Sequence, residues 1–172
     1  VRSSNNSYYY NLPLEESYWS GLATDFIARF PDNYIIAPND SVIIGLHTQS
    51  IFSSSYGYDA DLNLFEDFRN AVGDSLSISF GLDFASQNMF GDSQEMLMLF
   101  YFNSLTDSLV KDVDYFLWGS ASNAVDKTGI SNYFNDTPVE EQIYIRAADE
   151  GEIYIRVSTS ENGELSIGGN GI

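Results

Sequence analysis

The hydrophobic and polar positions of residues 95–119 predict two strands joined by a polar loop. Met96–Phe102 is an uninterrupted apolar run rich in Phe and Tyr. It is shorter than the roughly 18 apolar residues of a membrane span, and it favours a strand buried on both faces. Val110–Trp118 alternates instead, so we expect a central hairpin with one partly solvated strand. The two predicted faces of this strand are Val113, Tyr115 and Leu117, and Asp112, Asp114, Phe116 and Trp118.

Shorter apolar stretches, each bounded by turn residues, predict further strands along the chain. These stretches are 8–10, 21–30, 34–36, 41–46 and 75–84. Gln49–Tyr56 ends at Gly57, which predicts a helical turn or two with a glycine stop. The phrase IYIR occurs at Ile143–Arg146 and again at the start of Ile153–Val157, and both copies alternate apolar with polar residues. The two copies predict an antiparallel pair of strands near the C terminus.

The composition favours β structure in one domain. Of the 172 residues, 44% are hydrophobic and 15% are aromatic, with twelve Tyr and twelve Phe. Aromatic side chains fit a pleated surface well, and a chain of this length buries a substantial core without metal or disulfide bonds. We therefore expect an all-β sandwich over residues 1–172, with one or two short helical turns. Residues 1–7 are expected to form a flexible start and residues 158–172 a tail.

The charge and the missing residue types exclude several functions. A formal net charge of -18 would repel a nucleic acid backbone and attract divalent cations. The chain has no cysteine, which excludes disulfides, thiolate metal sites and a cysteine nucleophile. No stretch is long and apolar enough for a membrane span, and none has the pattern of a signal peptide. Because it begins at Val1 rather than Met, we expect a processed product or a fragment.

Several separate strings of the sequence match one known pattern in the same order. One is DSLVKDVDYFLWG at 107–119, which is followed by AVDKTGI from Ala124 and by the final GGNGI. Another is ARFPDNYIIAPNDSVIIGLH at 28–47, with Tyr-Gly at 56–57. These strings resemble the bacterial branch of the lamin tail domain family and cover most of the chain from about Tyr8 onward.

The resemblance implies an immunoglobulin-like antiparallel β-sandwich in a secreted or surface-attached protein, used for binding or structure without catalysis. It also implies that Trp118 is a core residue and that Asp126–Gly129 forms an ordered turn. Family domains normally begin with a strand pair before the region that matches Tyr8, and Val1–Ser7 is too short to contain that pair. We therefore expect a truncated domain, or one completed by strands of another chain at an exposed edge.

Acidic residues in two places are candidate metal ligands. Asp59, Asp61 and Asn63 have the spacing that begins an EF-hand calcium loop, but Leu64 and Asn70 replace the glycine and glutamate that the loop requires. The sequence is compatible with a calcium site of another kind and with a solvated loop. Two further candidates, Asp112 and Asp114, could flank a cation or serve as a glycosidase pair if another carboxylate faced them. The candidate calcium ligands in the 59–67 loop are Asp59, Asp61, Glu66 and Asp67.

Aromatic residues near the N terminus predict either a sugar-binding platform or core packing. They are Tyr8, Tyr9, Tyr10, Tyr18 and Trp19. The lone histidine, His47, cannot form a two-histidine metal site, and we expect it to have a structural or surface role.

These observations lead to a hypothesis of a non-enzymatic structural module, extracellular or at a cell surface. It would act by protein association, chiefly with other copies of itself, as a subunit of a surface assembly or filament completed by strand exchange. This hypothesis requires no cofactor. The alternative is a calcium-dependent adhesive or carbohydrate-binding module that uses the 59–67 loop and exposed aromatic residues. A third hypothesis is a hydrolase built on Asp112 or Asp114.

Overall fold

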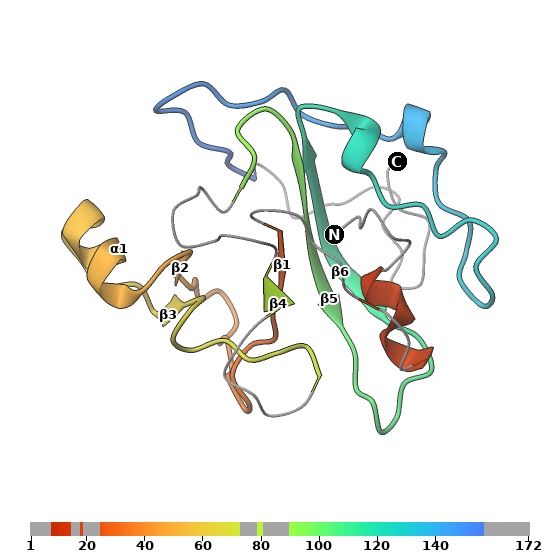
Figure 1. The fold of residues 1–172 in the computed structure, drawn as a ribbon, viewed down its shortest axis with the longest axis horizontal. Helices are drawn as coiled ribbons and strands as arrows, with labels where there is room; N and C mark the ends of the chain where they lie inside the picture. The colour runs from red at the N-terminus through yellow and green to blue at the C-terminus, as the bar shows by residue number, and fades with distance from the viewer. Residues whose placement is uncertain (1–7, 15–17, 19–24, 73–78, 81–89, 157–172) are drawn as a thin grey trace. The chain divides into compact units, whose positions relative to one another are not determined.

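The strands pair in three separate two-stranded sheets rather than in a sandwich (Figure 1). The computed structural model describes residues 8–14, 18, 25–72, 79–80 and 90–156. Within these residues β1 pairs with β4, β2 with β3, and β5 with β6. Four of these strands are two residues long, and β2 and β3 run parallel. The predicted immunoglobulin-like antiparallel sandwich is therefore wrong, because most apolar stretches in the described ranges have no extended partner there to complete a ladder.

The chain divides into two compact units. The first contains Val1–Leu22 and Phe90–Ile172, and the second contains Ala23–Met89. The predicted start at 1–7, the tail at 158–172 and most of the predicted strand at 75–84 lie outside the described residues. The prediction of a single domain stays a prediction. No helix in the described part of the chain is long and apolar enough to cross a membrane.

The first unit is built on an antiparallel hairpin of β5 (Glu95–Tyr101) and β6 (Lys111–Trp118). Figure 1 shows these two as the longest strands in the described part of the chain. Met96 is buried, whereas Leu97 and Leu99 are 41% and 42% exposed. The prediction that this strand is buried on both faces is therefore wrong. It has one core face, which is the arrangement expected of an antiparallel hairpin with one side uncovered.

A β-bulge interrupts the alternation of β6. Leu99 pairs with Asp114 and Phe100 pairs with Asp112, so Val113 has no residue opposite it. Residues that face each other across an antiparallel pair point to the same side, and successive residues of β5 point to opposite sides. Asp112 therefore lies on the core face with Phe100, and Asp114 lies on the other face with Leu99. The prediction that these two aspartates share a face is wrong, because the bulge inserts one residue between them.

Short helical turns and loops cover the core face of the hairpin. The predicted Tyr8–Tyr10 strand is instead the beginning of the 3₁₀ helix η1 (Tyr9–Leu14). Two more 3₁₀ turns follow β6, at η3 (Ala121–Asn123) and η4 (Val139–Glu141). The buried residues of this unit are Tyr9, Tyr10, Leu12, Met96, Val110, Leu117, Trp118, Ala124 and Val125, together with polar residues described below. Trp118 is buried, as expected of a core residue, but it lies on the opposite face of β6, where Tyr154 and Gly91 contact it.

The two IYIR copies do not pair with each other. Ile145 forms a parallel bridge with Trp118, accepting a hydrogen bond from Gly119 N–H at 2.8 Å and donating one to the Leu117 carbonyl at 3.1 Å. Its backbone groups are therefore already used by the end of β6. The predicted antiparallel pair is wrong for 143–146 and 153–156.

The second unit contains β1 (Phe26–Ile27), β2 (Ile44–Gly45), α1 (Gln49–Tyr56), β3 (Leu62–Asn63) and β4 (Ser79–Phe80). Its core is formed by Leu62, Leu64 and Phe68, with Phe26, Ala28, Phe30, Val42, Leu46 and Phe65 packed against them. The predicted helix is confirmed with its bounds. It ends because Gly57 takes the left-handed conformation at φ +78° and donates its N–H to the Ser53 carbonyl, as helix C-caps do.

Candidate binding pocket

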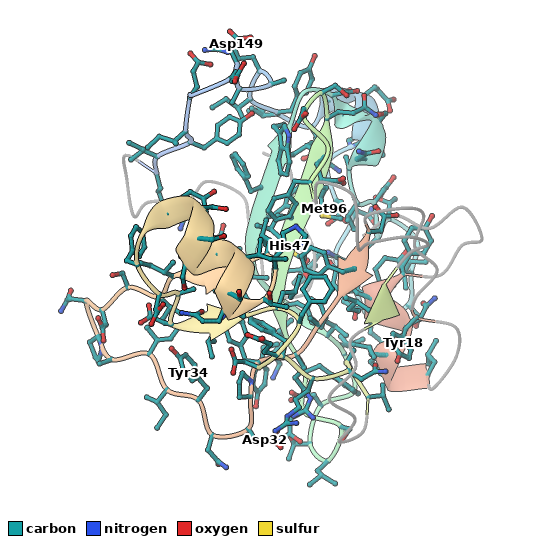
Figure 2. All side chains as sticks on the ribbon, turned by 60° about the vertical axis from the view of Figure 1, so that its left-hand side comes forward. Tyr18, Asp32, Tyr34, His47, Met96 and Asp149 are labelled. Atoms are coloured by element: carbon teal, nitrogen blue, oxygen red, sulfur yellow. The ribbon has the colours of Figure 1, made fainter. Side chains whose placement is uncertain are left out.

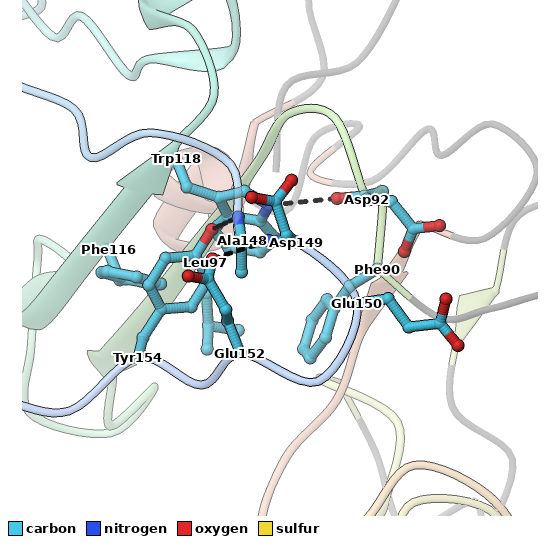
Figure 3. Close-up of a pocket in the computed structure, with 11 residues that line it drawn as sticks. Phe90, Asp92, Leu97, Phe116, Trp118, Ala148, Asp149, Glu150, Glu152 and Tyr154 are labelled. Carbon is cyan, nitrogen blue, oxygen red and sulfur yellow. Dashed lines mark hydrogen bonds between the residues drawn. The ribbon is translucent and has the colours of Figure 1, made fainter.

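A pocket of about 560 Å³ lies against the uncovered face of the hairpin in the first unit (Figure 3). Its walls combine aromatic rings with carboxylates and come from three segments: the turn before β5, the hairpin itself, and the loop around residue 150. The lining residues are Phe90, Gly91, Asp92, Leu97, Phe116, Trp118, Ala148, Asp149, Glu150, Glu152 and Tyr154.

Aromatic rings form a connected wall of the pocket. The Phe116 and Trp118 rings are stacked with centroids 5.3 Å apart, and Phe90 meets Trp118 edge-on at 5.7 Å. Tyr154 packs on both β6 residues, with centroids 4.9 Å from Phe116 and 6.1 Å from Trp118. Alternation along β6 accounts for this arrangement, because Phe116 and Trp118 are two residues apart and project from the same face. Each ring therefore helps to fix the orientation of its neighbour.

The acidic side of the pocket is a loop closed by its own polar contacts. The Tyr154 hydroxyl accepts a hydrogen bond from Ala148 N–H at 2.7 Å and donates one to the Arg146 carbonyl at 3.0 Å. The Arg146 guanidinium pairs with Glu152 at 2.7 Å, which lowers the pKa of that exposed carboxyl to about 2. Asp149 projects from the outer end of the loop in Figure 2, with its side chain 89% exposed. The Arg146 contact therefore favours the ionised form of the Glu152 carboxylate.

The opposite edge of the pocket depends on close approach of two backbone segments. Trp118 donates its indole N–H to the Gly91 carbonyl at 3.0 Å. Gly119, directly after β6, has φ +77°, and a Cβ there would lie 1.8 Å from the Ser93 carbonyl oxygen. Only glycine permits this contact, because any side chain would collide with the backbone of the 91–94 turn.

The pocket has the chemistry of a site for a cation with an apolar stem. Ring faces attract positive charge through their quadrupole, and carboxylates add charge-assisted hydrogen bonds. Four lining residues carry carboxylates, and none of the described lining residues is a lysine or arginine. Arg146, just outside the lining, offsets part of this charge through Glu152 and Asp149.

The carboxylates proposed as calcium ligands each accept hydrogen bonds within the second unit. Asp59 accepts from the Ser53 hydroxyl, and Asp61 accepts from Ile43 N–H at 2.8 Å. Glu66 and Asp67 accept from the backbone N–H groups of Gln49 and Asn63, respectively. Among the described residues, no group of three or more acidic or histidine side chains is arranged to hold a metal ion. The calcium site stays a prediction.

Asp112 and Asp114 belong to two different surroundings. Asp114 lies on the uncovered face and pairs with Arg156 at 2.9 Å. Asp112 is buried and contacts the Lys127 ammonium; it also accepts a hydrogen bond from the Tyr9 hydroxyl at 2.7 Å. The structure therefore does not bring the two together as a pair.

Two of the five N-terminal aromatic residues lie in the core, and Tyr8 and Tyr18 are half-buried. Tyr9 and Tyr10 are buried, and Tyr8 stacks on Tyr10 with centroids 4.9 Å apart. Trp19 lies outside the described residues. His47 is partly buried and stacks on Phe65 at 5.6 Å, which agrees with the structural role expected of it.

Sequence reasoning missed the pocket and the buried lysine. The signal for the pocket was present: an acidic stretch, 147–152, stands between two tyrosine-containing repeats and follows a strand with Phe116 and Trp118 on one face. Interpreting the repeats as paired strands reduced that stretch to a turn. The Asp126–Gly129 turn was expected and is confirmed, since Asp126 Oδ1 accepts from Thr128 N–H at 2.8 Å and Gly129 has φ +78°. The turn's role in burying Lys127 was not expected.

No protein-family model, curated protein or solved structure matches the chain. The resemblance to the lamin tail domain family stays a prediction.

Proposed function

We propose that the chain is a non-enzymatic protein-association module that takes a lysine or arginine side chain of its partner into the aromatic and acidic pocket. The observation that carries this proposal is the composition of the lining, in which four aromatic rings stand beside four carboxylates. A long cationic side chain fits this combination, because its methylene stem packs on the rings while its charged head meets the acidic loop.

The charge of the whole chain supports a basic partner. A net charge of -18 steers a cationic surface toward the protein and repels a second copy of the same chain. A basic segment of a different protein is therefore a better partner than another copy. The proposed setting is extracellular or at a cell surface, as expected from the sequence. This association does not involve strand exchange, which would require a sandwich that the described residues do not form.

The test compares two short peptides that differ only in charge. The chain is titrated with acetyl-Gly-Arg-Gly-amide and with acetyl-Gly-citrulline-Gly-amide while NMR follows the indole N–H signals. Citrulline keeps the shape and loses the positive charge. A cation–π contact and a charge-assisted hydrogen bond each contribute about 1 to 2 kcal/mol, so we expect at least about tenfold weaker binding of the citrulline peptide. Equal affinity for the two peptides, or for a neutral oligosaccharide, would contradict the proposal.

A matched pair of variants separates the pocket from the overall charge. Asp92→Asn with Glu150→Gln removes two carboxylates of the lining and keeps its shape. Glu140→Gln with Glu141→Gln makes the same change in charge at exposed positions outside the lining. We expect the first pair to weaken binding of the arginine peptide and the second to leave it nearly unchanged. If both pairs weakened binding equally, long-range charge alone would explain the affinity.

A further inference from the structure

Lys127 is buried completely, with its ammonium group between two carboxylates. It is one of two lysines in the chain and is 0% exposed. Its Nζ contacts Asp112 Oδ2 directly and lies 3.8 Å from Asp136 Oδ2. The side chains of the two aspartates are 3% and 0% exposed. This cluster lies on the core face of β6, whereas the pocket lies on the other face.

The position is unusual for a lysine. Lysine normally keeps its charged head in water. Burying an ion pair carries a desolvation cost that an ion pair at the surface does not have. The cluster brings two buried carboxyl groups to one ammonium group. A condensation that converts the Lys127 ammonium and one carboxylate into a neutral amide would remove the charged pair from the interior.

We propose that Lys127 and Asp112 form an intramolecular amide bond, with Asp136 carrying the proton. A proton moves from the ammonium to Asp112, which leaves a neutral amine beside a carboxylic acid. The Nζ lone pair attacks Asp112 Cγ, and the new N–C bond gives a tetrahedral intermediate. Asp136 takes a proton from Nζ and returns it to Oδ2, the C–O bond breaks, and one water molecule leaves. No oxidant or cofactor is consumed.

The neighbouring groups suit each part of this step. Asp136 is held in place by the hydrogen bond that its Oδ2 accepts from the Lys127 backbone N–H at 2.6 Å. The Tyr9 hydroxyl donates to Asp112 Oδ1 at 2.7 Å, on the oxygen where negative charge develops in the intermediate. Burial raises the pKa of Tyr9 well above its ordinary value, so this donor stays protonated. The Tyr9 and Tyr133 rings lie with centroids 5.9 Å from Nζ, and such close walls keep out the water that would reverse the reaction.

The other lysine provides an internal comparison. Lys111 also pairs with a carboxylate, Asp107, at 2.9 Å. Its side chain is 44% exposed, so solvation stabilises the ionised pair, and within the described residues its salt bridge is to Asp107 alone. Proximity of a lysine to an aspartate is therefore common to both sites, and the surroundings of Lys127 are what favour condensation.

Mass spectrometry of the whole denatured chain tests the proposal directly. We expect the mass to fall short of the sequence mass by one water molecule. Trypsin should then fail to cut after Lys127, giving one looped peptide, 112–146, in place of the separate peptides 112–127 and 128–146. Backbone fragment ions should be missing between 112 and 127. A chain at its full sequence mass, or a water loss located elsewhere, such as between residues 127 and 136, would overturn the proposal.

Variants then assign the roles. Lys127→Arg should restore the full sequence mass, and Lys111→Arg should keep the loss of one water molecule. Asp136→Asn keeps both reacting groups and removes the proton carrier, so a chain with native circular dichroism should retain its full mass. If that variant formed the same loop at the wild-type rate, Asp136 would not be the proton carrier. The wild-type mass decides the existence of the bond whether or not a variant folds.

Discussion

Gly119→Ala should destabilise the first unit more than any other exchange of one glycine for alanine in its described turns. The residue stands where β6 leaves the hairpin, and its N–H donates to the Ile145 carbonyl at 2.8 Å. A Cβ at this position would lie 1.8 Å from the Ser93 carbonyl oxygen and 2.7 Å from Gln94 Cα. Both neighbours are backbone atoms, so the collision cannot be relieved by rotating a side chain.

Two costs add at this position. A left-handed backbone costs a residue with a Cβ about 1 to 2 kcal/mol, and forcing atoms into a packed site costs about 1 to 3 kcal/mol more. Their sum of about 2 to 5 kcal/mol is a large part of the about 5 to 15 kcal/mol that keeps a domain folded. Gly129 provides the control, because it has φ +78° but nothing within 4 Å of its ideal Cβ. Gly129→Ala should therefore show only the cost of the left-handed backbone conformation.

Urea unfolding, followed by tryptophan fluorescence, measures both free energies of unfolding. The difference between the two variants isolates the collision with the 91–94 turn. Trp118 donates its indole N–H to the Gly91 carbonyl in that turn, so Gly119→Ala should also weaken binding of the arginine peptide. Equal destabilisation by the two variants would refute the close approach of the two backbone segments that forms this edge of the pocket.

Three further predictions concern single side chains. Tyr9→Phe removes the hydroxyl that donates to Asp112 Oδ1 in the interior and should cost about 1 to 3 kcal/mol of unfolding free energy, whereas Tyr8→Phe keeps its stacking ring and should change little. Burial raises the pKa of Tyr133 from 10.0 to about 12, so the stability that this neutral hydroxyl contributes should be lost as pH rises through about 12, measured by phenolate absorbance. The Arg146 contact, with a hydrogen bond from Asp149 N–H, lowers the pKa of Glu152 from 4.5 to about 2, so the stabilising effect should be lost as pH falls from about 4.5 to about 2; NMR titration should show the pKa raised toward 4.5 in Arg146→Gln.

The features that the sequence predicted well are those decided by neighbouring residues. The helix at Gln49–Tyr56 was predicted with its bounds because Gly57 can take the left-handed conformation that ends it. The Asp126–Gly129 turn, which the family resemblance implied, is also closed locally, since Asp126 accepts a hydrogen bond from the backbone N–H two residues ahead. The hairpin itself was expected because its strands are long and joined by a polar loop. None of these depends on a distant partner.

The features that were predicted wrongly depend on partners far along the chain. The 41–46 stretch is apolar enough for a strand, yet only Ile44 and Gly45 pair, because the partner β3 is itself two residues long. The second IYIR copy looks like a strand, but Tyr154 directs its hydroxyl to the 146–148 backbone and closes a loop. Alternation describes which side chains share a face, and it does not reveal which backbone will lie alongside.

The bulge at Val113 shows how one unpaired residue sets the composition of both candidate sites. With uninterrupted alternation, Asp112 would share the pocket face with Asp114 and Phe116, and Lys127 would be left with Asp136 alone. The inserted residue turns Asp112 to the core face instead, where it meets Lys127 and Tyr9. Bulges re-aim side chains in this way, and no local signal in the sequence marks this one. The two proposals therefore share a structural origin but can fail independently, since peptide binding reports on one face of β6 and the mass of the chain reports on the other.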